Sequence, residues 1–433
     1  MLTVSFRTFG CKLNQAETAT IIQDFKERGY HVVSPEKPAD VFVINTCTVT
    51  ERSDAKCRRA IQKALRTNPN TTVLVVGCYS QVAPNEIDQI QGVDYVFGTK
   101  EKFNIFEYFP GPGKLLQRKY FITPTAQLKE AVSRTGDYSG HTRAFLKIQD
   151  GCNYRCSYCI IPFTRGASRS VPMEEVINQA EILAEKGYRE IVLTGVHIGE
   201  YGKDIGKDSL LPALLQQLAE LKGISRIRLS SLESEDITDE LLESIEKSEK
   251  ICRHFHIPLQ SGSNKILSAM NRRYTVEMFG EKIEKITDRF KNIGLGTDII
   301  VGFPGETESL FEETFRLVEK LPFTYLHVFP FSPRRGTKAY SMPDQVEPRI
   351  RMKRAKKLRI LGVKKKEDFA QQWNGKVVKV LLEGRNYKGW MKGITSEYLR
   401  VEVPYEVSLE NQLVDVKIEK SESSSVKGRI IAL

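Results

Sequence analysis

The sequence of 433 residues predicts an α/β fold in three parts: a parallel sheet, an incomplete (β/α)6 barrel and a small antiparallel β-barrel. Three observations predict it. Short apolar runs alternate with helical patterns near the amino terminus, six further strand–helix alternations follow, and alternating strands take over after Trp373. Hydrophobic residues make up 40% of the chain and charged residues 27%, a balance that indicates a globular protein with sizeable cores.

The first part contains three apolar strands, at 4–9, 41–44 and 73–76, separated by helices at 14–28 and 54–65. Strands that are apolar throughout, rather than at alternate positions, are typical of a parallel sheet whose two faces are both covered. We therefore expect a Rossmann-like sheet with helices on each side.

The second part alternates strands and helices in the same way. Its six expected strands lie at 144–149, 190–196, 226–232, 254–259, 297–301 and 325–331. The helical patterns between them include 174–186, 210–221, 277–291 and 310–319. A complete barrel of this kind has eight repeats, so six predict a partial one.

The third part begins with a basic segment and ends in short strands. Residues 349–366 hold ten Lys or Arg and no Asp or Glu, and we expect a helix here with Ile350, Ala355, Leu358 and Leu361 on one apolar face. Strands are expected at 376–382, 390–395, 399–403 and 414–418. They predict a small antiparallel barrel of the oligonucleotide-binding (OB-like) type.

These parts give three expected domains, at 1–113, 138–368 and 371–433, with a connector at 110–138. The net charge of +11 suits an anionic partner, either nucleic acid or an acidic membrane, although a merely soluble basic protein would also show it. We see no apolar run long enough for a membrane helix and no secretory signal, so we expect no membrane association and a cytoplasmic location.

Cys152, Cys156 and Cys159 form a C-x3-C-x2-C loop directly after the first barrel strand. Enzymes built on barrels of this kind place their chemistry at this end. A [4Fe–4S] cluster normally takes four cysteines, so three would leave one iron open for a substrate. Zinc is the main alternative, but zinc sites favour a distant second ligand pair, which this sequence does not offer.

Cys11, Cys47 and Cys78 each follow a predicted strand of the first sheet. The carboxyl ends of parallel strands share one edge, where open α/β proteins bind ligands, so we expect the three thiols to converge. The alternative is that each is a buried structural thiol. Cys57 and Cys252 have no comparable motif and are expected to be structural.

The 152–159 loop, with Tyr158 before its last cysteine, resembles that of the radical S-adenosylmethionine superfamily. The resemblance implies that the open iron binds S-adenosylmethionine and that reductive cleavage gives a 5′-deoxyadenosyl radical. It also implies cofactor contacts along the barrel edge. The residues expected to make them are Tyr158, Gly195, Gly199, Ser231, Glu233, Gln260 and Gly302. No catalytic side chain is assigned.

The motifs around Cys11, Cys47 and Cys78 resemble the amino-terminal domain of methylthiotransferases, where such cysteines hold an auxiliary [4Fe–4S] cluster. The third part resembles their TRAM module. The segment 9–15, Phe-Gly-Cys-Lys-Leu-Asn-Gln, looks most like bacterial enzymes acting on N6-threonylcarbamoyladenosine at tRNA position 37. The resemblance thus implies two clusters, S-adenosylmethionine, the tRNA anticodon stem-loop, and an electron donor such as flavodoxin or ferredoxin.

The expected function is conversion of that nucleoside to its 2-methylthio derivative. Two alternatives stay open from the sequence. One is methylthiolation of an aspartate in a ribosomal protein, which would use the same clusters. The other is a non-catalytic iron–sulfur RNA-binding protein, which would explain the charge and the small barrel but not a cluster loop with an open iron.

Overall fold

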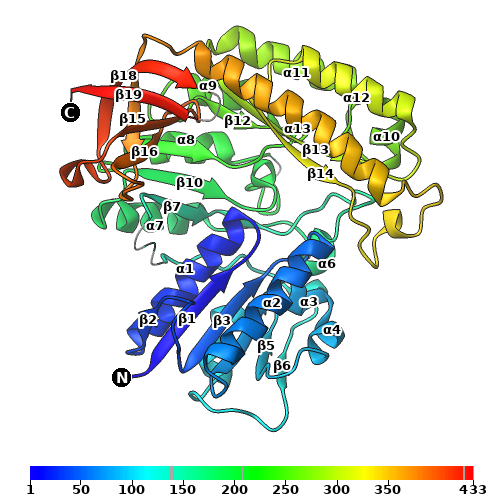
Figure 1. The fold of residues 1–433 in the computed structure, drawn as a ribbon, viewed down its shortest axis with the longest axis vertical. Helices are drawn as coiled ribbons and strands as arrows, with labels where there is room; N and C mark the ends of the chain where they lie inside the picture. The colour runs from blue at the N-terminus through cyan, green and yellow to red at the C-terminus, as the bar shows by residue number, and fades with distance from the viewer. Residues whose placement is uncertain (137, 139–140, 207, 423–424, 433) are drawn as a thin grey trace.

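The computed structural model describes residues 1–433 except 137, 139–140, 207, 423–424 and 433. Portions of the expected connector and domains that fall on those positions lie outside the described residues. Figure 1 shows the amino-terminal sheet in blue and cyan, the larger barrel in green and yellow, and the small carboxyl-terminal barrel in red. The fold class predicted from the sequence is confirmed.

The amino-terminal sheet has six parallel strands in the order β2-β1-β3-β4-β5-β6. They are β1 (Thr3–Thr8), β2 (His31–Val33), β3 (Val41–Thr46), β4 (Thr72–Gly77), β5 (Tyr95–Phe97) and β6 (Lys119–Phe121). One face packs on α1 (Lys12–Glu27) and α5 (Ile105–Tyr108). The other packs on α2 (Glu51–Thr67), α3 (Cys78–Val82) and α4 (Pro84–Asp88). Both faces are covered, as the apolar strands predicted.

The larger barrel has six parallel strands. They are β7 (Arg143–Lys147), β10 (Glu190–Thr194), β11 (Arg226–Leu229), β12 (His254–His256), β13 (Gly294–Val301) and β14 (Tyr325–Pro330). They pair as two three-stranded sheets that single bridges join between β11 and β12. In the described part of the chain β7 pairs with β10 alone and β14 with β13 alone, so the barrel stays open, as six repeats predicted.

Helices pack outside this barrel, and short elements flank its mouth. The helices are α7 (Met173–Glu185), α8 (Leu211–Glu220), α9 (Asp239–Glu246), α10 (Asn264–Ala269), α11 (Val276–Arg289) and α12 (Glu308–Lys320). The short elements are β8 (Gln149–Asp150), β9 (Arg169–Ser170) and α6 (Ile161–Arg165). Single 3-10 turns complete the set: η1 (Glu101–Phe103), η2 (Thr125–Gln127), η3 (Ile198–Glu200), η4 (Ser234–Asp236), η5 (Lys338–Tyr340) and η6 (Val407–Leu409).

The basic segment forms α13 (Pro348–Gln371), which lies along β14 and beside α12 (Figure 1). Ala355, Leu358 and Leu361 are buried as predicted, but Ile350 is exposed, because at that turn Arg351 faces the barrel instead. No helix in the described part of the chain is long and apolar enough to cross a membrane.

The carboxyl-terminal barrel closes in the order β15-β16-β17-β19-β18. Its strands are β15 (Val377–Leu382), β16 (Trp390–Ile394), β17 (Arg400–Pro404), β18 (Leu413–Glu422) and β19 (Ser425–Ala432). The sequence did not predict β19, because a polar run precedes it and Gly428 interrupts it. Since β19 is the hairpin partner of β18, closing the barrel makes it parallel to β17, so the barrel is mixed rather than purely antiparallel.

Buried arginines of β11 attach the small barrel to the large one. Arg228 donates to the carbonyl oxygens of Thr395 and Ser396, each at 2.9 Å, and its Nε lies 2.8 Å from Glu190. Arg226 makes two further bonds of the same kind, each at 2.7 Å. A guanidinium that satisfies carbonyls of one barrel and a carboxylate of the other fixes their mutual orientation.

Replacing Arg228 should loosen this junction. We expect Arg228→Met to lower the free energy of opening of β15 and β16 by about 3 kcal/mol, because Glu190 keeps a buried charge without its main partner. Hydrogen exchange measured by mass spectrometry on those strands tests this. Arg316→Met, at an exposed position of α12, is the matched control, and equal exchange in the two variants would contradict the prediction.

Candidate active site

Cys11, Cys47 and Cys78 lie at the carboxyl ends of β1, β3 and β4, which are neighbours in the sheet. Cys11 is the N-cap residue of α1, Cys47 follows β3 directly, and Cys78 is the first residue of α3. Cys47 and Cys78 are buried, whereas Cys11 is exposed. The strand order thus brings the three cysteines to one edge, as the parallel topology predicted.

The chain turns tightly at this edge. Gly10 has a φ of +105°, and a Cβ added there would lie 2.8 Å from the Cβ of Cys47 and 3.1 Å from its Sγ. Both the backbone angle and the lack of space require glycine. Because Gly10 has no side chain, the segment that carries Cys11 can lie directly against Cys47.

The three thiols act on one another electrostatically. Burial, with smaller contributions from repulsion by Cys78 and Cys11, raises the pKa of Cys47 to about 12. The pKa of Cys11 is raised as well, because protein atoms around its sulfur take water away from the thiolate although the residue as a whole is exposed, and Arg165 opposes this rise. Thiols this close cannot all ionise without a bound cation to offset the repulsion, and metal binding displaces their protons. The donor set therefore fits an iron–sulfur cluster.

The second cysteine group follows β8. Gly151 has a φ of +73°, and a Cβ there would clash with the carbonyl oxygen of Ala167, so glycine is required where the loop leaves the strand. The loop then turns so that the amide of Cys159 donates to the carbonyl of Cys156 at 3.0 Å. Cys152 begins this turn, and all three cysteines are partly exposed.

Ser157 fixes the middle of this loop to the end of α10. Its hydroxyl donates to the carbonyl of Ala269 at 2.8 Å, and its amide donates to that of Met270 at 3.0 Å. Burial, with repulsion from the other two thiols of the loop, raises the pKa of Cys159 to about 12. This group is thus a second convergent set of thiols that fits a metal cluster.

Two basic side chains face this loop. Arg272 Nη1 lies 3.4 Å from the Sγ of Cys156, and it opposes the rise in that thiol's pKa caused by burial. His197 Nδ1 lies 3.8 Å from the Sγ of Cys152. Although burial opposes protonation, Asp236 and Cys152 raise the pKa of His197 to about 10, so the imidazole is cationic at neutral pH. Both charges favour an anionic cluster here.

A cavity of about 220 Å³ lies beside the barrel cysteine loop. Tyr158 and Cys159 line it from the barrel. Val49 and Thr50, which come shortly after Cys47, line it from the amino-terminal sheet. This cavity, which we call the chamber, therefore lies where the barrel loop meets the segment that follows Cys47, and Cys159 is the cysteine among its lining residues.

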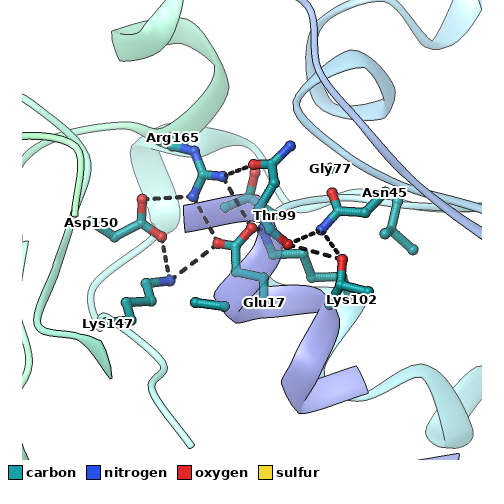
Figure 2. A network of polar contacts seen from close by, with 12 residues as sticks. Glu17, Asn45, Gly77, Thr99, Lys102, Lys147, Asp150 and Arg165 are labelled. Atoms are coloured by element: carbon teal, nitrogen blue, oxygen red, sulfur yellow. Dashed lines mark hydrogen bonds and ion pairs between the residues drawn. The ribbon is translucent and has the colours of Figure 1, made fainter. Parts of the chain in front are cut away.

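A buried ion cluster is formed by side chains from α1, η1, β7, β8 and α6 (Figure 2). Arg165, at the end of α6, pairs with Glu17 of α1 at 2.7 Å and with Asp150 of β8 at 3.0 Å. Glu17 also forms ion pairs with Lys102 at 2.7 Å and with Lys147 at 3.3 Å. These five side chains are at most 4% exposed. The cluster ties the amino-terminal sheet to the barrel.

The ends of the ion cluster reach both cysteine groups. Arg165 donates to the Oδ1 of Asn14 at 2.8 Å, and Asn14 donates to the carbonyl of Thr46, the residue before Cys47, at 3.0 Å. At the other end the carboxylate of Asp150 accepts a hydrogen bond at 2.8 Å from the amide of Gly151, the residue before Cys152. The cluster therefore sets the position of one cysteine group relative to the other.

The predicted cofactor contacts divide into two sets. Tyr158 and Gln260 line the chamber. The others lie against protein neighbours: Gly195 against Gln149, Gly199 against Asp236, Gly302 against Arg351, Ser231 in a bridge to His256, and Glu233 paired with Arg272. Their contact with a cofactor stays a prediction.

Sequence reasoning missed a polar group on the last three barrel strands. His256 Nε2 lies 2.9 Å from the Oδ1 of Asp298, and His327 Nδ1 lies 3.2 Å from the same atom. Asp298 also lines the chamber. The signal was present as polar residues in the otherwise apolar strands β12 and β13. A lone polar residue near a strand end, however, does not by itself indicate a site.

A larger cavity, of about 450 Å³, opens between β14, α13 and the carboxyl-terminal barrel. Its lining includes His327, Tyr398, Lys366 and Arg400. It contains none of the cysteines, so its size does not make it the reaction site. His327 contributes to this groove and contacts Asp298 of the chamber, which places the groove beside the chamber.

Part of the basic character of α13 is internal. Arg354 pairs with Glu306 at 2.8 Å and with Glu308 at 3.1 Å, and Arg351 donates to the carbonyl of Phe331 at 2.9 Å. These buried arginines are therefore not available to an anionic partner. The basic residues of this segment that remain exposed without an ion pair in the described chain are Arg349, Lys353, Lys356, Arg359, Lys364 and Lys366, of which Arg359 donates to the carbonyl of Val328.

Two family models match the chain. The Radical SAM superfamily matches residues 146–318, and Uncharacterized protein family UPF0004 matches residues 3–98. The first match spans the loop with Cys152, Cys156 and Cys159, and the second spans Cys11, Cys47 and Cys78. The two cysteine groups thus belong to two separately recognised families.

Characterised relatives match nearly the full length. Threonylcarbamoyladenosine tRNA methylthiotransferase MtaB of Bacillus subtilis is 41% identical over 97% of this chain and 94% of its own. MtaB of Thermotoga maritima is 37% identical, over 93% and 91%. The tRNA-2-methylthio-N(6)-dimethylallyladenosine synthase of Thermoanaerobacter pseudethanolicus is 36% identical, over 98% and 92%.

Among solved structures, the radical S-adenosylmethionine methyltransferase TsrM of Kitasatospora setae superposes with a TM-score of 0.55. The match covers 76% of this chain and 73% of TsrM at 14% identity. This likeness shows the fold alone.

The ion cluster gives a pH-dependent contribution to stability. Although burial opposes ionisation, Arg165, Lys102 and Lys147 lower the pKa of Glu17 from 4.5 to about 2. The stabilisation is complete above pH 4.5 and is lost as the pH falls toward 2. We expect Glu17→Gln to cost about 3 kcal/mol of unfolding free energy at pH 7 and much less near pH 2.

Hydrogen exchange of α1 across this pH range measures the effect. Glu281→Gln, at an exposed position of α11, is the matched control. If the difference in exchange rate between wild type and Glu17→Gln stays the same on acidification, the cationic partners of Glu17 do not lower its pKa, and the prediction is wrong.

Proposed function

The chain belongs to the radical S-adenosylmethionine methylthiotransferase family, and on this premise we propose that it converts N6-threonylcarbamoyladenosine at tRNA position 37 to the 2-methylthio derivative. The observation that carries the proposal is the presence of two groups of three cysteines, with a cavity where the barrel loop meets the segment after Cys47, in a chain that is 41% identical to an MtaB enzyme. Insertion at an aromatic C–H that offers no easily removed proton requires radical chemistry, which explains the family's cofactors.

Cys152, Cys156 and Cys159 would hold the radical cluster. A [4Fe–4S] cluster held there by three thiolates would supply an open iron for S-adenosylmethionine and the reducing electron for its radical cleavage. Tyr158 and Gln260 would border the cofactor, since both line the chamber next to Cys159. A reductant such as flavodoxin or ferredoxin remains the expected electron source.

Cys11, Cys47 and Cys78 would hold the auxiliary [4Fe–4S] cluster, which would supply the site for the sulfur to be inserted, and a second S-adenosylmethionine would supply the methyl group. Arg165 lowers the pKa of Cys11 and so favours its thiolate, and the Oδ1 of Asn14 lies 3.7 Å from the Cys11 sulfur. The protein's contribution would thus be to hold the two cluster sites in fixed positions relative to the target base.

The RNA must present its base to this chamber. Adenosine 37 would be turned out of the anticodon-loop stack, at an unstacking cost of a few kcal/mol. Lys353, Lys356 and Lys364 on the exposed side of α13 would contact phosphates, together with the small carboxyl-terminal barrel. These contacts position the loop and carry no base specificity.

The cluster assignment predicts separable iron. Anaerobic reconstitution should give about eight irons per chain, and Cys11→Ser and Cys152→Ser should each give about four. Cys152→Ser should abolish 5′-deoxyadenosine formation, whereas Cys11→Ser should retain it and form no methylthio product. Cys252→Ala, outside both groups, should keep all the iron. Full iron content in Cys11→Ser would contradict the auxiliary site.

The substrate assignment predicts a nucleoside change. In tRNA from cells lacking this protein, mass spectrometry should find 2-methylthio-N6-threonylcarbamoyladenosine absent and its unthiolated precursor accumulated. Complementation with wild type, but not Cys152→Ser, should restore it. If the 2-methylthio-N6-dimethylallyladenosine of tRNA is lost instead, the substrate of this protein is N6-dimethylallyladenosine. Unchanged nucleosides with loss of a methylthio-aspartate in a ribosomal protein would move the activity to that target.

A further inference from the structure

The turn that ends α10 directs Arg272 toward the barrel cysteine loop. Asn271 has a φ of +58°, in the left-handed region that asparagine tolerates. The amide of Asn271 donates to the carbonyl of Ser268 at 2.9 Å, and the amide of Arg272 donates to the carbonyl of Leu267 at 2.9 Å. Many helices end with this pair of hydrogen bonds. The backbone of α10 therefore fixes the direction in which Arg272 leaves the helix.

The same turn is bonded directly to the loop. The side-chain amide of Asn271 donates to the carbonyl of Arg155 at 2.9 Å. Ser157 adds the two bonds to the end of α10 that are described above, one from its hydroxyl and one from its amide. Three hydrogen bonds thus join the turn that carries Arg272 to the loop that carries the cysteines, so the two segments hold a fixed relative position.

The guanidinium of Arg272 is buried between a sulfur and a carboxylate. Its Nη1 lies 3.4 Å from the Sγ of Cys156, its Nη2 pairs with the carboxylate of Glu233, and its side chain is 2% exposed. The guanidinium also lies 4.9 Å from the centre of the Tyr274 ring, whose hydroxyl is bonded to two backbone carbonyls. One N–H edge of a fixed cation therefore faces Cys156, and the other faces Glu233.

Two neighbouring arginines make different contacts. Arg155 donates to the backbone carbonyls of Cys152 and Tyr154, at 3.0 and 3.2 Å. Arg273 is exposed, and its guanidinium lies 3.9 Å from the centre of the Tyr154 ring. Of these three described arginines, Arg272 is the one with an N–H within hydrogen-bond distance of a cysteine sulfur. Arg273, the next residue in the chain, therefore offers a matched comparison.

A cation in this position acts on the energy of adding an electron. Iron-bound thiolates are negative, and reduction of a cluster adds a further negative charge. Hydrogen bonds to the cluster sulfurs and nearby positive charge stabilise the reduced form and raise the reduction potential. Because the side chain of Arg272 is buried, salt does not screen its charge as it would at the surface. Glu233 offsets part of this charge, but it binds the nitrogen that does not face the sulfur.

We propose that Arg272 raises the reduction potential of the cluster held by the barrel cysteine loop, and that Glu233 limits this rise. The proposal rests on the cluster site of the proposed function. Arg272 acts through the sulfur of Cys156 and is thus a positioning residue. The electron comes from a low-potential one-electron donor such as flavodoxin or ferredoxin, and no bond to Arg272 forms or breaks. Glu233, expected from the sequence to contact the cofactor, would then also act through Arg272.

The test is an anaerobic redox titration followed by electron paramagnetic resonance, without S-adenosylmethionine or RNA. The full chain carries Cys11→Ser, so that the loop cluster alone contributes. We expect Arg272→Gln to make reduction about tenfold less favourable, which lowers the midpoint potential by about 59 mV for a one-electron couple. Arg272→Lys keeps the charge and should recover most of that shift. Glu233→Gln should shift the potential upward, because the guanidinium loses its counter-charge.

Arg273→Gln is the matched control and should leave the potential unchanged. If Arg272→Gln and Glu233→Gln both titrate at the parent potential, or both shift it in the same direction, Arg272 does not set the potential. Iron and sulfide are counted in each variant. Should Arg272→Gln hold no cluster, the opposite shifts expected of Arg272→Lys and Glu233→Gln decide the question. A Cys11→Ser parent without a four-iron cluster would instead overturn the cofactor assignment of the proposed function.

Discussion

The pairing of Arg165 with Glu17 and Asp150 is the interaction on which the site depends. The two cysteine groups belong to different sheets, and the chain between those sheets contains little regular structure, so connectivity alone cannot fix their separation. Buried ions cost several kcal/mol each unless they are fully paired. Here each carboxylate is shared by at least two cations, so the arrangement favours one relative position of the sheets over any other.

The same cluster has an electrostatic consequence. Its three cations, Arg165, Lys102 and Lys147, outnumber the carboxylates of Glu17 and Asp150, so it carries an excess positive charge between the cysteine groups. Thiolates bound to iron are negative, and excess positive charge nearby favours them. One set of contacts thus both positions the two groups and favours the ionised state that metal binding requires.

Strand topology could be predicted from the sequence, whereas tertiary charge pairing could not. Parallel strands place the residues after them at one edge, so the convergence of Cys11, Cys47 and Cys78 could be derived. Glu17 could not be recognised in this way, because a single acid in a helix normally faces solvent. Strand β19 was missed because its inward side chains come after a polar run, and its register is set by closure of the barrel rather than by local preference.

The basic helix shows why total charge is a poor guide to an interface. Arg351 and Arg354 contribute to the net charge of +11, yet both are buried and satisfied by the barrel. A phosphate could displace these partners only by leaving Glu306 and a backbone carbonyl buried and unpaired, which costs more than an exposed phosphate contact returns. Any RNA contact on α13 must therefore come from its exposed basic residues, while the buried Arg351 and Arg354 hold the helix in the place from which those residues act.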